Sequence, residues 1–86
     1  MQEKSEIVDI SAEHVRAARG LLTWTLEELA TRSGVTATTI HMWERGKTKP
    51  TELTKQLIQR AFENAGIEFT NGDKPGVKWR RDHLPN

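Results

Sequence analysis

Apolar side chains recur at helical spacing along most of this chain, and each such stretch follows a Ser or Thr that can cap a helix. The predicted helices begin after Ser11, Thr25, Thr36 and Thr51 and run to about Leu22, to a turn at Gly34, to about Arg45 and to Ala65. Glu28, three residues after Thr25, completes a capping box. Gly46 and Gly66 end the third and fourth helices. The pattern therefore predicts a mainly α-helical fold.

Residues 26–45 hold the most informative pattern, two short amphipathic helices joined at Gly34. Glycine adopts the positive φ of a tight turn at no steric cost. The residues expected to pack the two helices together are small or apolar: Ala30, Val35, Ile40 and Trp43. This arrangement is typical of a DNA-binding helix-turn-helix.

The fourth predicted helix follows a linker, residues 47–50, in which Pro50 prevents a continuous helix. Its apolar residues fall at helical spacing. They are Leu53, Leu57, Ile58, Ala61, Phe62 and Ala65. We expect this face to cover the core, and a groove for a partner is the alternative.

The C-terminal segment changes its period. Residues 67–70 and 77–80 alternate apolar and polar side chains, and turn-forming residues 71–76 separate them. This predicts a two-stranded antiparallel hairpin. Two strands alone are marginally stable in water. The apolar residues Ile67, Phe69, Val77 and Trp79 must therefore pack on the helices or pair with a second copy of the chain.

The length of 86 residues is sufficient for one small domain. We divide it into a lead-in over residues 1–10, a helical domain over residues 11–66 and a hairpin with its tail over residues 67–86. The chain has no cysteine, which excludes disulfides and fits a reducing cytoplasm. The polar, acidic N-terminus leads us to expect no signal peptide, and no apolar run approaches the roughly 20 residues of a membrane span.

The formal net charge is only +1, so the total charge does not predict nucleic-acid binding. The distribution of charge is more informative. Residues 1–30 carry three basic and six acidic side chains, whereas residues 31–60 carry six basic and two acidic ones. The positive charge therefore lies in and just after the segment expected to contact DNA.

The sequence contains no recognisable catalytic motif. His14, His41 and His83 are not spaced as metal ligands, and the glycines within residues 70–76 lack the spacing of a phosphate-binding loop. No nucleophile elbow surrounds a serine. We expect no enzyme activity, no metal and no cofactor.

Short motifs along the helical domain point to a family. They are Ala18-Arg19, Leu29-Ala30, Gly34-Val35, Thr39-Ile40, Glu44-Arg45-Gly46 and Pro50. Together they resemble the Cro and phage-repressor-like helix-turn-helix regulators, the xenobiotic-response-element type, from about Ser11 to Ala65. The resemblance implies a four-helix repressor-like domain, here followed by the C-terminal two-stranded β-hairpin. It also implies structural roles, including a buried Arg19–Glu44 ion pair, for Arg19, Ala30, Gly34, Ile40, Trp43, Glu44 and Gly46.

The resemblance makes the third helix the recognition helix, with its N-terminal residues at base edges in the major groove. The matching positions are Ala37, Thr38, His41 and Met42. Thr38 can donate or accept, the apolar side chains suit a thymine methyl, and His41 can donate to guanine. No Arg or Gln is present there for a bidentate base contact, so we expect modest specificity built on methyl contacts and DNA shape.

Phosphate contacts are expected from hydroxyls at helix N-termini and from cations near the third helix. They are Thr25, Arg32, Thr36, Thr39, Arg45, Lys47 and Lys49. Many members of the family carry a glutamine that grips the backbone where this chain has Leu26, which cannot. If about four cations touch phosphate, log K should fall with log salt with a slope of about −3 to −4.

The sequence therefore predicts a regulator of double-stranded DNA that binds as a homodimer at a two-fold symmetric operator and represses by steric exclusion of polymerase. The hairpin or the fourth helix is the expected dimer contact. The alternative is a protein-interaction module, either the antitoxin of a toxin–antitoxin pair or a transcription adaptor. The weakly polar recognition helix leaves room for this alternative.

Overall fold

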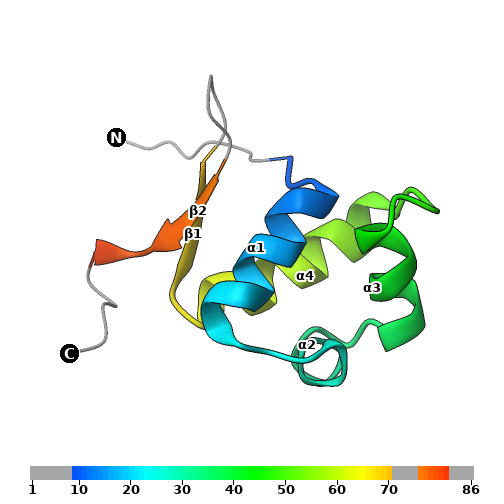
Figure 1. The fold of residues 1–86 in the computed structure, drawn as a ribbon, viewed down its shortest axis with the longest axis horizontal. Helices are drawn as coiled ribbons and strands as arrows, with labels where there is room; N and C mark the ends of the chain where they lie inside the picture. Colours follow the sequence, from blue (N-terminus) through cyan, green and yellow to red (C-terminus); the bar gives the residue numbers. More distant parts are fainter. Residues whose placement is uncertain (1–8, 71–75, 82–86) are drawn as a thin grey trace.

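The computed structural model describes residues 9–70 and 76–81, which form four α-helices and a two-stranded antiparallel sheet. The elements are α1 (Ala12–Leu22), α2 (Leu26–Ser33), α3 (Ala37–Glu44), α4 (Glu52–Asn64), β1 (Ile67–Thr70) and β2 (Gly76–Trp79). The predicted helical fold with a C-terminal hairpin is thus confirmed, while His83 and residues 71–75 of the hairpin loop lie outside the described residues. Figure 1 shows the hairpin at one end of the long axis and α3 at the other. None of the described helices is long and apolar enough to cross a membrane.

Every described helix begins at the cap that the sequence predicts. The side-chain oxygen of each cap accepts a hydrogen bond from the backbone N–H three residues on. The caps are Ser11, Thr25, Thr36 and Thr51. In return, the Thr25 amide donates to Glu28 Oε1 at 2.7 Å. Gly34 has φ 80°, the left-handed conformation that turns the chain from α2 into α3. Local sequence therefore sets where each helix starts and how the helix-turn-helix turns.

His14 has a structural role that the sequence did not predict. The residue is 4% exposed, and its Nδ1 accepts a hydrogen bond from the Ser11 amide at 2.9 Å. Because Nδ1 is an acceptor, Nε2 carries the proton and donates to the Thr70 carbonyl at 3.2 Å. The ring also meets Phe69 edge-on, with centroids 5.6 Å apart. His14 thus ties the start of α1 to the end of β1.

The hairpin packs on the helices through one apolar face. Ile67 pairs with Trp79 and Phe69 with Val77, which places these four side chains together. β1 lies against α4 and β2 against α1. The hairpin side chains join a core made of Ile10, Val15, Ala18, Leu29, Val35, Ile40, Trp43, Ile58, Ala61, Phe62, Ile67 and Phe69. The hairpin therefore packs on the helices, the first of the two predicted ways to bury its apolar residues.

The apolar face of α4 is narrower than predicted. Ile58, Ala61 and Phe62 are buried, but Leu53 is 64% and Leu57 37% exposed. At about 100° per residue, these two leucines lie about 90–130° from the centre of the buried stripe. The expectation that all six apolar residues cover the core was wrong for Leu53 and Leu57, which face solvent.

Gly20 and Gly34 provide a matched pair for testing the turn. A methyl group at either position would meet no heavy atom within 4 Å, but only Gly34 has a positive φ. We expect Gly20→Ala to raise the free energy of unfolding by about 0.5–1 kcal/mol, because alanine suits a helix better. Gly34→Ala should lower it by about 1–2 kcal/mol, because a Cβ is strained in the left-handed region. Urea unfolding followed by circular dichroism measures both, and equal changes would contradict this account.

Candidate nucleic-acid interface

The outward face of α3 is fixed by what its inward face buries. Ile40, Trp43 and Glu44 are each 6% exposed or less. The predicted base-contacting residues, together with Thr39, occupy the rest of the helix. Thr38 and His41 are exposed, and Ala37 and Met42 are half-buried. A short helix thus presents the hydroxyls of Thr38 and Thr39 and the imidazole of His41 to solvent, beside two half-buried apolar side chains.

The N-terminus of α3 is open to an anion. Thr36 Oγ1 accepts from the Thr39 amide at 3.3 Å and donates to Thr39 Oγ1 at 2.9 Å. The hydroxyl hydrogen of Thr39 is then available to a phosphate, and the first turn of α3 carries no acidic side chain. The first turn of α2 carries Glu27 and Glu28. The N-terminus of α3 is therefore a better anion site than that of α2, where Thr25 lies.

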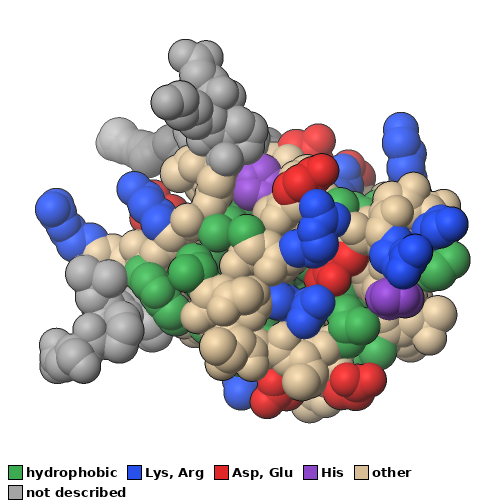
Figure 2. Space-filling model, viewed as in Figure 1, with side chains coloured by type: hydrophobic (Ala, Val, Ile, Leu, Met, Phe, Trp, Pro, Cys, Tyr) green, Lys and Arg blue, Asp and Glu red, His purple; other side chains and the backbone are tan. Residues whose placement is uncertain are grey.

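Three cations follow α3 directly. Arg45, Lys47 and Lys49 are exposed, and none of the ion pairs among residues 9–70 and 76–81 involves them. Figure 2 shows Lys and Arg side chains gathered on this side of the molecule, over the C-terminal end of α3 and the loop before α4. The structure therefore groups three of the four predicted phosphate-binding cations beside the exposed face of α3.

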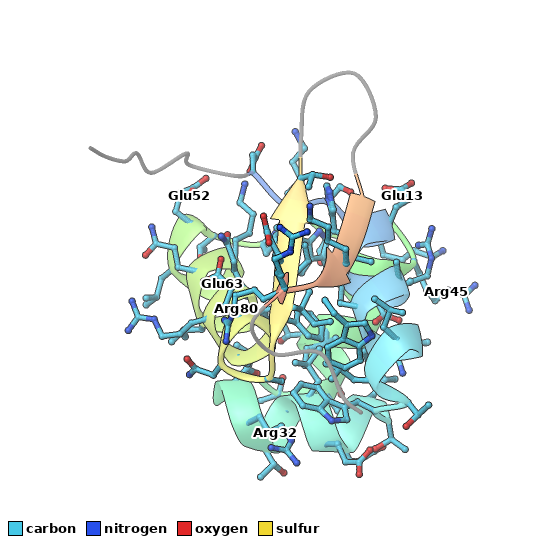
Figure 3. All side chains as sticks on the ribbon, turned by 90° about the vertical axis from the view of Figure 1, so that its left-hand side faces the viewer. Glu13, Arg32, Arg45, Glu52, Glu63 and Arg80 are labelled. Carbon is cyan, nitrogen blue, oxygen red and sulfur yellow. The ribbon has the colours of Figure 1, made fainter. Side chains whose placement is uncertain are left out.

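Arg32, the fourth of these cations, lies elsewhere. Its guanidinium carbon is 4.6 Å from the centroid of the Trp24 ring, a cation–π contact. It also lines a hollow with residues at the C-terminal end of α4, Ala61, Asn64 and Ala65. In Figure 3, Arg32 and Arg45 extend from different sides of the domain. The structure thus places Arg32 on a different side of the domain from Arg45, and its phosphate contact stays a prediction.

Arg19 and Glu44 join α1 to the end of α3. Arg19 Nε and Nη2 donate to the two carboxylate oxygens of Glu44 at 2.7 and 2.9 Å. Its Nη1 donates to the Trp24 carbonyl at 2.7 Å. The Glu44 side chain is 5% exposed, and its hydrogen bonds raise the pKa of Arg19 above the ordinary value. The recognition helix is therefore held against α1 by a charge-assisted, bidentate contact.

Arg16 is a residue of this site that the sequence analysis missed. Its Nη1 donates to the main-chain carbonyl of Glu44. The spacing held a signal, because Arg16 lies three residues before Arg19 and thus on the same side of α1.

Comparison with protein families matches residues 15–64 to the model of a helix-turn-helix family of the Cro/C1 type. The chain belongs to this helix-turn-helix family. It is therefore a DNA-binding transcriptional regulator, in which α2 and α3 form the helix-turn-helix. No curated protein matches the chain significantly.

The Arg19–Glu44 pair is testable by a double-mutant cycle. We expect Arg19→Met and Glu44→Leu each to lower the free energy of unfolding by about 3–5 kcal/mol, because each leaves a charge without its partner. The double variant should lose much less than the sum, since no charge is then stranded. Guanidinium denaturation measures all three.

The control for this cycle is Lys55→Met, which removes pairs with Asp9 and Glu52, whose side chains are 75% and 78% exposed. It should change the free energy of unfolding far less than either single variant of the cycle, because solvent screens exposed ion pairs. Additive losses at Arg19 and Glu44 would contradict the coupling.

Proposed function

We propose that this helix-turn-helix regulator is a sequence-specific repressor that binds a two-fold symmetric operator as a homodimer and excludes polymerase from it. The observation that carries the proposal is the exposed face of α3, with Thr38 and His41 outward and Arg45, Lys47 and Lys49 directly after it. In helix-turn-helix proteins, the second helix enters the major groove with its N-terminal residues at base edges.

The chemistry of this face suggests how DNA is read. Thr38 and His41 can hydrogen-bond to base edges, and Ala37 and Met42 can pack on thymine methyl groups. No side chain among the four makes a bidentate contact, so DNA shape contributes the remaining specificity. Thr36, Thr39 and the three cations hold the backbone.

The proposed dimer contact is on α4. The apolar face of the hairpin is already covered by α1 and α4, whereas Leu53 and Leu57 remain exposed. A two-fold dimer would place two copies of α3 about one helical turn of DNA apart, about 34–36 Å. Repression then requires no cofactor, because an occupied operator blocks polymerase.

Exposed Leu53 and Leu57 also favour a second candidate function, the binding of a different protein, as in an antitoxin or a transcription adaptor. The two functions are separable. Arg45→Glu with Lys47→Glu should abolish DNA binding and leave contacts made by α4 intact. The matched charge control is Lys78→Glu with Arg81→Glu, two exposed cations that lie outside α4.

Selection from a randomised duplex pool at physiological salt tests the proposed function. We expect enrichment of a two-fold symmetric motif, with tolerance of base changes at thymine-rich positions. Sequencing of the retained duplexes gives the motif, and sedimentation gives the stoichiometry. Retention without enrichment would contradict sequence-specific reading. A strict guanine requirement opposite Ala37 or Thr38 would contradict the methyl-contact mode, and one protomer on a single half-site would contradict the dimer.

Salt dependence identifies the cations that contact phosphate. With three cations per protomer, the slope of log K against log salt should be about −2.7 per protomer. Lys47→Ala should reduce its magnitude by about 0.9, whereas Arg32→Ala should leave it unchanged and instead lower the free energy of unfolding by about 0.5–1 kcal/mol. Fluorescence anisotropy between 50 and 200 mM salt, roughly the range in which phosphate contacts are resolved, measures the slopes. An equal reduction by both variants would place Arg32 on DNA.

A further inference from the structure

The C-terminal carbonyls of α3 have a complete set of hydrogen-bond donors. A helix ends with four carbonyls that lack partners within the helix. Backbone amides after α3 donate hydrogen bonds to three of these carbonyls. Arg45 N–H donates to His41 O at 3.1 Å, Lys47 N–H to Met42 O at 2.8 Å and Gly46 N–H to Trp43 O at 2.9 Å. The fourth carbonyl, that of Glu44, accepts from Arg16 Nη1 instead. Arg16 therefore completes the cap of α3 from another helix, and its charge suits a helix C-terminus.

The two arginines of α1 hold different parts of the same residue. Arg19 binds the carboxylate of Glu44, and Arg16 binds its main-chain carbonyl. A side-chain contact alone allows the helix to turn about the flexible bonds of the glutamate. A second contact on the main chain restricts that motion, because it holds the backbone of the helix directly.

We propose that Arg16 is a positioning residue for the recognition helix, which sets the orientation of α3 and of the cationic loop after it by capping Glu44. The inference rests on the proposed function, in which α3 reads base edges. Arg45 follows Glu44 directly, so the contact also fixes the start of the segment that carries Lys47 and Lys49.

The competing role for Arg16 is a direct phosphate contact. Its side chain is 49% exposed and lies 3.9 Å from Glu13, also exposed, so a DNA backbone could reach it. The two roles make different predictions. A phosphate contact adds about 0.9 to the salt slope and acts only when DNA is bound. A positioning contact acts in the free protein and contributes to specificity rather than to the slope.

The experiment compares Arg16→Met, which keeps the aliphatic stem, with Arg16→Lys, which keeps a cationic donor. Lys47→Ala is the phosphate-contact control. The first readout is amide hydrogen exchange of Arg45, Gly46 and Lys47 in the free protein. The second is the affinity for the duplex that the wild-type protein enriches, and for a scrambled duplex of equal length, across a range of salt.

For Arg16→Met we expect exchange of these amides to speed up by about two- to fivefold. Affinity for the selected duplex should fall by about three- to tenfold and affinity for the scrambled duplex by less than about twofold, at an unchanged salt slope. Arg16→Lys should restore most of both losses. Lys47→Ala should leave exchange unchanged and reduce the slope.

Unchanged exchange together with a slope reduced by about 0.9 would overturn the proposal in favour of a phosphate contact. Unfolding of Arg16→Met, seen by circular dichroism, would overturn it too, because Arg16 would then support the whole fold. If the wild-type protein enriches no motif, the proposed function fails. The exchange data, measured without DNA, then decide separately whether Arg16 orders the end of α3.

Discussion

The burial of Glu44 against Arg19 is the constraint on which the rest of the structure depends. A carboxylate whose side chain is 5% exposed is costly to bury unless an oppositely charged partner binds it. Arg19 satisfies it and also binds the Trp24 carbonyl, so α1, the turn before α2 and the end of α3 must meet at one point. The recognition helix thus cannot tilt without separating a buried charge pair. A rigid α3 in turn allows a short helix with few polar side chains to present them in a fixed direction.

The same pair shapes the electrostatics of the surface proposed to bind DNA. Residues 31–60 contain only two acidic side chains, Glu44 and Glu52. Glu44 is neutralised inside the protein by Arg19, and Glu52 lies 3.1 Å from Lys55 on α4. The cations after α3 therefore meet no opposing charge among the described residues. A chain with a net charge of +1 can thus carry a locally basic surface, because the two acidic residues of this segment are buried or paired.

Sequence alone predicted the features that depend on neighbouring residues. The caps Ser11, Thr25, Thr36 and Thr51 and the turn at Gly34 follow from local hydrogen bonding and from backbone sterics. Features that depend on distant residues were missed, apart from the Arg19–Glu44 pair that the family resemblance implied. The period of α4 could not show that its partners cover only the Ile58–Phe62 side, nor could spacing show that Arg32 stacks on Trp24. The roles of Arg16 and His14 were missed for the same reason, because each acts on a backbone carbonyl far along the chain.

The position of Arg32 depends on a series of aromatic contacts that extends to the hairpin. Phe69 of the hairpin meets Phe62 of α4 with ring centroids 5.8 Å apart, and Phe62 stacks on Trp24 at 5.7 Å. The Arg32 guanidinium lies over the Trp24 ring, at the end of this series of aromatic contacts. The hairpin lies at the opposite end of the molecule from α3 (Figure 1). The aromatic contacts nevertheless connect it to Trp24, just before the start of α2. The hairpin therefore stabilises the start of the helix-turn-helix through these core contacts. The same series of contacts fixes the ring over which the Arg32 guanidinium lies.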